Sequence, residues 1–245
     1  MTLFWCTSET IPDGYGFAHY SPLHLEWLGV FVAAVILNGL LYRRLSSAGQ
    51  TIWRRCIACL LIADELFKVI PMLITGTYGP DYLPFHLCSV NIFMIAVHAW
   101  RPGRVLDNFL YTICIPGALA ALLFPTWTKL PAANFMCIHS FTVHILLALY
   151  PIVLTVCGQI RPDVRLLPRC FALLGGFACV AVVLNLLLDT NFMFLMHADA
   201  GNPLALFETW WGSHLWGFPV IIFAVVVVMH TPWILARRYK KSAAK

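Results

Sequence analysis

Two short stretches place reactive side chains inside otherwise apolar sequence. Residues 83–91 (Leu-Pro-Phe-His-Leu-Cys-Ser-Val-Asn) contain an imidazole, a thiol, a hydroxyl and an amide. Residues 137–144 (Cys-Ile-His-Ser-Phe-Thr-Val-His) contain two imidazoles and two hydroxyls. Polar groups are costly to place in lipid, so inside a membrane span they mark a functional site by default. A thiol with an imidazole is a combination used in nucleophilic catalysis, where the imidazole removes the thiol proton.

Cys88 is the candidate nucleophile. If Pro84 is the first residue of a helix, Cys88 lies about one turn inside it, near unpaired N–H groups and the positive end of the helix dipole. Asn91 shares the helix face of Cys88, whereas His86 points in nearly the opposite direction. The base that activates Cys88 must therefore come from another helix.

Two histidines of the second stretch compete for the role of base. Ser140 and His144 share one helix face, and His139 points roughly 140° away from it. At 1.5 Å per residue, Cys88 lies ~6 Å below the start of its helix, and His144 lies ~14 Å below the start of its own. Depth favours His139, but tilts and kinks can remove this difference, so both histidines stay candidates.

The composition indicates a polytopic helical membrane protein with a single domain over residues 1–245. The chain is 60% hydrophobic and 11% charged, whereas soluble domains carry about 25% charged residues. The net charge of +5 comes from basic residues in short loops between apolar runs, so it does not indicate nucleic acid. Nine cysteines, mostly inside apolar runs, argue against a disulfide framework.

Hydropathy predicts a bundle of seven transmembrane helices, each near the ~20 residues that cross a bilayer. The basic residues between them predict an outside N-terminus and a cytoplasmic C-terminus by the positive-inside rule. They lie at residues 43–55, 101–104 and 161–169 and in the tail after residue 236. The predicted spans are residues 24–42, 53–73, 84–100, 105–124, 135–157, 170–188 and 214–235.

Alternating span directions bring ionisable groups from several helices to the outer half of the bundle, which predicts a site there. The structural alternative is that Lys68 forms a buried ion pair with Asp64 or Glu65. Isolated polar residues of the cytoplasmic half, such as His98 and His230, are expected to join helices to one another. The converging candidates are Asp64, Glu65, Lys68, His86, Cys88, Asn91, His139, Ser140, His144, Asn185, Asn191 and His214.

Three stretches resemble a known family. Residues 83–89 resemble the Leu-Pro-x-His-x-Cys-Ser signature of the YwaF-like bacterial integral membrane proteins. Residues 140–144 and 189–195 resemble two other recurrent stretches of that family. These proteins are similar to the transmembrane protein 164 family, in which an acyltransferase moves a fatty acyl chain between phospholipids, and more distantly to the androgen-induced membrane hydrolases.

The resemblance implies a lipid acyltransferase, or lipid esterase, with Cys88 and His144 as the catalytic pair, membrane phospholipids as substrates, and no cofactor. It also implies a bacterial cytoplasmic membrane. In such a reaction the thiolate attacks an ester and holds the acyl group as a thioester, and a histidine transfers the protons. Candidate donors to the developing oxyanion are Asn91, Ser140, Asn185 and Asn191.

Two other classes of function remain open from the residues. A proton-coupled transporter, or a substrate-binding membrane component, would use Asp64, Glu65, Lys68 and His144. A metal-dependent hydrolase would use His86, His139, His144 and Asp189, but their spacings match no tight ligand motif, so no metal is predicted. The oligomeric state does not follow from the sequence.

Overall fold

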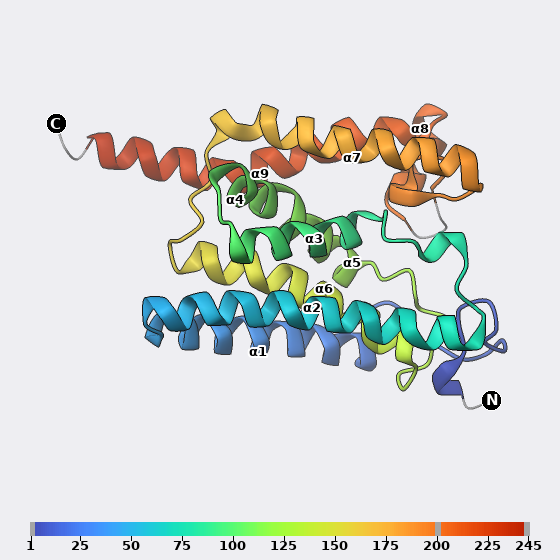
Figure 1. Cartoon of the computed structure of the whole chain (residues 1–245). Coiled ribbons are helices and arrows are strands. Elements are labelled where there is room, and N and C mark those ends of the chain that lie inside the picture. The colour runs from blue at the N-terminus through green and yellow to red at the C-terminus, as the bar shows by residue number, and fades with distance from the viewer. Residues whose placement is uncertain (1–2, 199–201, 243–245) are drawn as a thin grey trace.

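The computed structural model describes residues 3–198 and 202–242, with side chains as far as residue 236. Within these ranges the fold is helical and contains no strand, which confirms the predicted all-α class (Figure 1). The first half of the chain contains α1 (Pro22–Arg44), α2 (Ser47–Thr75), α3 (Leu87–Trp100), α4 (Arg104–Phe109) and α5 (Ile115–Leu123). The second half contains α6 (Phe135–Val156), α7 (Leu167–Leu188), α8 (Leu204–Trp211) and α9 (Gly217–Ser242).

The number of membrane spans corrects the prediction of seven. Within the described residues, six helical segments are long and apolar enough to cross a membrane. The predicted span at residues 53–73 is the one that fails. It does form a helix, the 29-residue α2, but Asp64, Glu65 and Lys68 interrupt its apolar stretch. The six candidate spans are Pro22–Arg44, Pro80–Trp100, Arg104–Leu123, Phe135–Val156, Val164–Leu188 and His214–Ala236.

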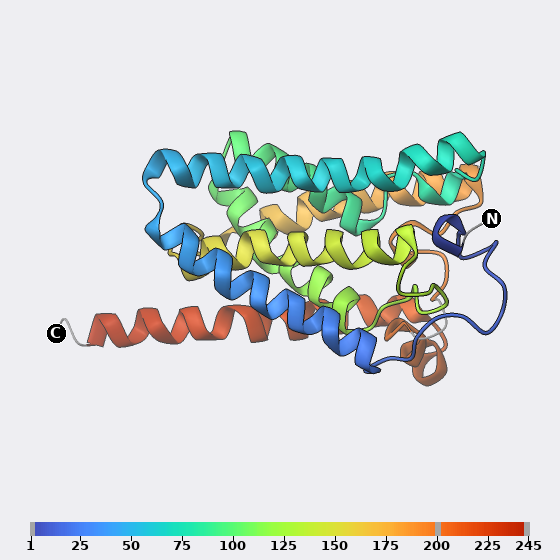
Figure 2. The ribbon, with the colours of Figure 1, turned by 90° about the horizontal axis from the view of Figure 1, so that it is seen from below.

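The helix α6 forms the centre of the bundle. It packs against α1, α2, α3 and α5, and Figures 1 and 2 show it enclosed by these helices. Buried residues make up 67% of its apolar window, against 6% for the window of α9. The side chain of Asn134 caps its start by accepting from the backbone N–H groups of Met136 and Cys137, which satisfies two of the four unpaired donors of the first turn.

The helix α3 begins later than the sequence suggests. Pro84 lies before the helix, His86 occupies the N-cap position with an extended backbone, and Leu87 is the first helical residue. Cys88 is therefore the second residue of α3 instead of lying a full turn inside it. This brings its sulfur closer to the N–H groups of the first turn, which have no acceptor within the helix.

A π-helical turn, Leu110–Cys114, joins α4 to α5. Pro116 follows it and has no N–H to donate to the carbonyl of Thr112, so a widened turn is tolerated there. The same turn holds α9 in place. The hydroxyl of Tyr111 donates to the backbone oxygen of Met229 over 2.7 Å, and Thr112 Oγ1 lies 2.9 Å from a ring nitrogen of His230.

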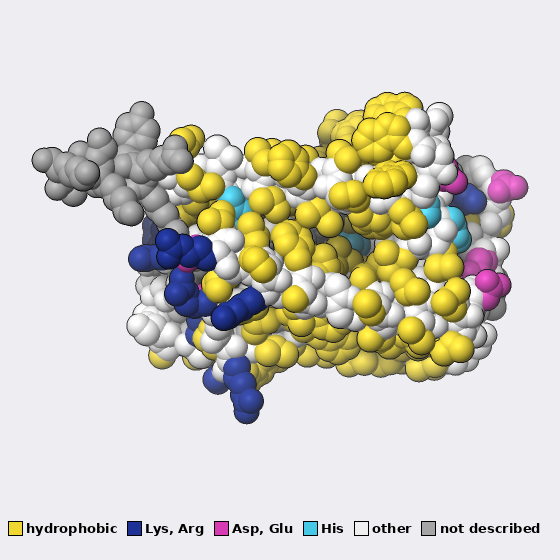
Figure 3. Space-filling model, turned by 90° about the horizontal axis from the view of Figure 1, so that it is seen from above, with side chains coloured by type: hydrophobic (Ala, Val, Ile, Leu, Met, Phe, Trp, Pro, Cys, Tyr) yellow, Lys and Arg dark blue, Asp and Glu magenta, His cyan; other side chains and the backbone are white. Residues whose placement is uncertain are grey.

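Charge is distributed unequally between the two ends of the bundle. Figure 3 shows Lys and Arg side chains gathered at one end and Asp and Glu side chains at the other, with a hydrophobic surface between them. This is the asymmetry from which the orientation was predicted. The basic side chains after residue 236 lie outside the described residues, and the orientation stays a prediction.

Candidate active site

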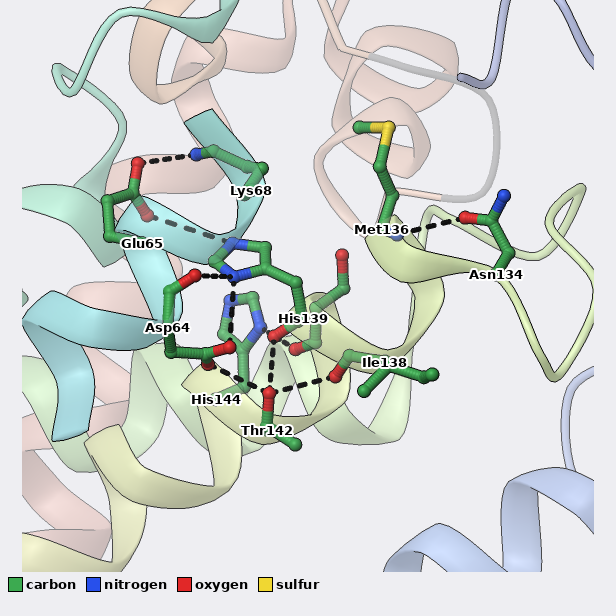
Figure 4. A network of polar contacts seen from close by, with 10 residues as sticks. Asp64, Glu65, Lys68, Asn134, Met136, Ile138, His139, Thr142 and His144 are labelled. Atoms are coloured by element: carbon green, nitrogen blue, oxygen red, sulfur yellow. Dashed lines mark hydrogen bonds and ion pairs between the residues drawn. The ribbon is translucent and has the colours of Figure 1, made fainter. Parts of the chain in front are cut away.

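Charged and polar groups of α2 and α6 form a cluster between these two helices. We define the charge cluster as Asp64, Glu65 and Lys68 of α2 with His139 and Thr142 of α6 (Figure 4). Lys68 Nζ lies 2.5 Å from Glu65 Oε1, and the hydroxyl of Thr142 donates to Asp64 Oδ2 over 2.8 Å. The Glu65–Lys68 ion pair that the sequence offered as a structural alternative is therefore formed, within a larger network.

Both ring nitrogens of His139 face groups of α2. Its Nδ1 lies 3.0 Å from the backbone oxygen of Asp64 and 3.4 Å from a carboxylate oxygen of the same residue. Its Nε2 lies 3.7 Å from Glu65 Oε2. A backbone carbonyl can only accept, so Nδ1 carries a hydrogen. The ring is buried between two carboxylates, which gives His139 an anchoring position and leaves it poorly placed to take a proton from a thiol.

His144 has one ring nitrogen available. Its Nδ1 lies 2.6 Å from the backbone oxygen of Ser140, which fixes the hydrogen on Nδ1 and leaves the Nε2 lone pair as the acceptor. Its ring stacks on Trp127 with centroids 5.2 Å apart and planes inclined by 11°. The side chain is only partly buried. An oriented imidazole with a free acceptor nitrogen has the geometry of a general base.

Cys88 lies at the start of α3, which packs against both α2 and α6. Its side chain is partly buried. The two stretches singled out in the sequence therefore lie on neighbouring helices, α3 and α6. In the described part of the chain no hydrogen bond joins Cys88 to His144, and catalytic hydrogen bonds often tighten only when substrate is bound.

Asn91 lies deep in α3, on the same helical face as Cys88. It is only 2% exposed, and its Oδ1 atom has no hydrogen-bond partner among the described residues. Ser140 contributes its backbone oxygen to His144, and its side chain is partly accessible. Asn91 and Ser140 therefore remain candidate side-chain donors to the oxyanion, because each lies within about one helical turn of Cys88 or His144.

The remaining predicted site residues lie elsewhere. His86, Asn185 and Asn191 line an outer cavity of about 460 Å³. Asn185 accepts from the backbone N–H of Phe192 and Asn191 from that of Met196, so their amides hold the loop after α7. His214 is buried in the turn before α9. The cavity is lined by Asp81, His86, Asn185, Leu186, Asp189, Thr190, Asn191, Phe194, Met196 and His197.

The four residues of the metal-hydrolase hypothesis are divided between two places. His86 and Asp189 line the outer cavity, whereas His139 belongs to the charge cluster and His144 lies beside it. Within the described ranges no group of three or more His, Cys, Asp or Glu residues is arranged to hold a metal ion. The geometry does not assemble these residues into one ligand set.

Two residues of the site were missed in the sequence. Trp127 was not among the predicted site residues, yet it stacks on the His144 ring. Thr142 belongs to the second stretch but was given no role, and it binds the Asp64 carboxylate. Thr142 follows His139 by three residues, a helical spacing that could have placed both side chains toward α2.

Comparison with known proteins gives one match. No curated protein and no solved structure matches the chain. Residues 16–230 match the TMEM164 family over nearly the whole described bundle. This match does not distinguish a YwaF-like bacterial branch, so that narrower resemblance stays a prediction. The chain therefore belongs to the TMEM164 family of multi-pass membrane proteins.

Proposed function

We propose that this protein is a membrane lipid acyltransferase in which Cys88 is the nucleophile and His144 the base. The observation that carries the proposal is that Cys88 lies at the start of α3, which packs against α6, and that α6 carries His144 with a free Nε2. The acyltransferase activity implied by the family resemblance supports the same pair.

The reaction proceeds in two half-reactions. His144 Nε2 takes the Cys88 proton while the sulfur attacks the carbonyl carbon of a lipid ester, and the carbonyl becomes an oxyanion. The C–O bond to the glycerol backbone then breaks, and the alkoxide takes the proton from His144, which releases lyso-lipid. In the second half, His144 removes a proton from an acceptor hydroxyl, which attacks the thioester, and Cys88 leaves with that proton.

The start of α3 supplies the groups that stabilise the oxyanion. Its first-turn N–H groups point away from the helix body and have no acceptor within the helix. They therefore serve as hydrogen-bond donors beside the reacting sulfur, supported by the positive end of the helix dipole. These backbone donors replace Asn185 and Asn191 as candidate oxyanion donors, because the amides of those two residues hold the loop after α7.

Membrane phospholipids are the proposed substrates, and the six candidate spans, which are long and apolar enough to cross a membrane, support this proposal. We further propose that the basic end of the bundle is cytoplasmic, so that the site faces the outer leaflet. A bacterial cytoplasmic membrane is the proposed location, on the basis of the family resemblance.

The test is mass spectrometry of purified protein after incubation with vesicles of a phospholipid carrying an isotopically labelled acyl chain. We expect labelled thioester on Cys88 together with lyso-lipid. Cys88→Ala should abolish both, and His144→Ala should slow turnover by about 10²- to 10⁴-fold. Cys59→Ala, which removes an exposed thiol of α2, is the matched control and should react like the wild type. Full turnover by Cys88→Ala would refute the proposal.

One observation favours a second candidate, a proton-coupled transporter. Asp64, His139, Glu65 and Lys68 form a continuous chain of ionisable groups between α2 and α6, as proton relays do. In proteoliposomes with an internal pH-sensitive dye, this function predicts proton flux that Glu65→Gln abolishes and Cys88→Ala leaves intact. Flux equal to that of empty liposomes would exclude it.

A further inference from the structure

A groove of about 220 Å³ runs between α1 and α6. Figure 2 shows α1 lying across α6 on the outside of the bundle, and the two helices pack directly against each other. The groove is lined by apolar residues and by one arginine at its end. The lining residues are Val35, Ile36, Gly39, Leu40 and Arg43 of α1 and Ile152, Val153 and Val156 of α6.

Gly39 gives the groove its depth. Glycine destabilises the interior of a helix relative to alanine, yet close packing does not require it here, because a Cβ atom at this position would meet no other atom within 4 Å. Val153 at the base of the groove is fully buried, whereas Ile36, Leu40 and Val156 are each more than half exposed. The groove is therefore apolar and open to the surroundings of the bundle, as a site for a flexible apolar chain must be.

Arg43 adds a positive charge to one end of the groove. It lies in the last turn of α1, at the end of the bundle where Lys and Arg side chains gather (Figure 3). Its Nη2 donates to the backbone oxygen of Val156 over 3.4 Å, and in the described part of the chain it has no carboxylate partner. A guanidinium has five N–H donors, so most of them remain for an acceptor outside the chain. Arg54 approaches the same end of α6 and donates to Gln159 Oε1 over 3.3 Å.

The length of the groove matches one leaflet of a bilayer. Val35 and Arg43 are separated by ~12 Å along α1, and the hydrocarbon of one leaflet is ~15 Å thick, half of the ~30 Å core. Basic pockets between membrane helices bind anionic lipid head groups. The groove is also separate from the candidate active site, because Ile152 lies ~12 Å beyond His144 along α6.

We propose that the groove between α1 and α6 binds one anionic phospholipid from the leaflet at the basic end of the bundle, with an acyl chain beside Gly39 and its phosphate on Arg43. A guanidinium can hold a phosphate through two parallel N–H···O bonds. The net negative charge of the head group adds attraction to Arg54, which the ammonium of a zwitterionic head group opposes. This lipid is a bound ligand and not a substrate, so the inference does not depend on acyl transfer.

The experiment is native mass spectrometry of the purified protein with phosphatidylglycerol or phosphatidylcholine. Both probes carry the same ether-linked chains, which contain no ester for the protein to cleave. We expect one phosphatidylglycerol to bind at least fivefold more tightly than phosphatidylcholine, and Arg43→Gln to weaken its binding about fivefold. Gly39→Phe should abolish this binding, because the ring fills the groove.

Two matched variants serve as controls. Arg44→Gln removes the neighbouring charge of α1, which does not line the groove. Gly29→Phe places the same ring on α1 at another glycine with open space around it. Both variants should bind phosphatidylglycerol nearly as the wild type does.

Equal binding of the two lipids, or equal affinities of Arg43→Gln and Arg44→Gln, would overturn the inference. So would a dimer that Gly39→Phe dissociates, because a second copy of the chain would then occupy the groove. Loss of the bound lipid in Cys88→Ala would place the lipid at the candidate active site instead. Melting temperatures identify variants that do not fold, and if Gly39→Phe is one of them, the comparison of Arg43→Gln with Arg44→Gln decides.

Discussion

At the scale of single residues, the histidines differ by what each ring nitrogen contacts. His24 lies with Nε2 2.7 Å from the backbone oxygen of Leu122 and Nδ1 2.9 Å from the backbone nitrogen of Tyr20, so both nitrogens have structural partners. His139 is enclosed by groups of α2. His144 alone of these three combines a fixed Nδ1 hydrogen with an unengaged Nε2 and partial accessibility. This is why we propose the catalytic role for it.

The stacked Trp127 makes a prediction about this imidazole. An aromatic pair contributes about 0.5–1.5 kcal/mol, so Trp127→Ala should reduce kcat by roughly 2- to 10-fold through a less ordered His144 ring. Trp127→Phe keeps a ring in place and should recover most of the loss. Lipid turnover measured over a range of substrate concentrations separates kcat from KM. A change in KM alone would show that Trp127 contacts the lipid and does not orient the base.

At the scale of elements, the sequence indicated which helices carry the candidate residues but not how these helices are placed. The stretches at α3 and α6 were recognised because polar groups stand out in apolar sequence. The start of α3 could not be predicted, because a proline can either begin a helix or precede it, and here the chain stays extended at His86. The depth argument for His139 depended on that start and on straight helices, so it could not decide between the two histidines.

The partners of each side chain were also beyond prediction. Spacing along α6 showed that Ser140 and His144 share a face, but the contact involves the backbone oxygen of Ser140 and not its hydroxyl. The engagement of Asn185 depends on how the loop after α7 folds back onto it. Such contacts follow from tertiary packing, which local patterns do not encode.

The cap of α6 gives a prediction at this scale. Asn134 is fully buried. Its oxygen caps α6, and its amide nitrogen donates to the backbone oxygens of Leu3 and Cys6 over 2.9 Å and 2.8 Å. Asn134→Ala should lower the free energy of unfolding by about 2 kcal/mol through the lost cap and the unpaired carbonyls. Amide hydrogen exchange should become faster both in residues 3–11 and in the first turn of α6.

Asn134→Asp separates the two roles. An aspartate still accepts from the first-turn N–H groups but cannot donate to the N-terminal segment. Exchange should then rise in residues 3–11 while the start of α6 stays protected. Equal exchange in both regions for both variants would show that the cap and the tether are not independent.

At the scale of the whole molecule, α2 contributes residues to the site and also decides the number of candidate membrane spans. The three charged residues that remove α2 from the candidate spans are the same residues that form the charge cluster. The site residues of α2 are thus the reason why this helix is not a candidate span. Its charges face α6 and the site instead of lipid, and the exposed surface of α2 is formed by apolar side chains such as Ile62, Leu66 and Leu73.

The orientation of the bundle is the last prediction. Figures 1 and 2 show α1 beginning at one end of the bundle and α9 finishing at the other, and Figure 3 places the basic side chains at the end where α9 finishes. The positive-inside rule makes that end cytoplasmic. In sealed right-side-out vesicles, an added protease should spare a C-terminal tag, and in inverted vesicles it should remove this tag. Removal of the C-terminal tag from outside would reverse the orientation and move the site to the inner leaflet.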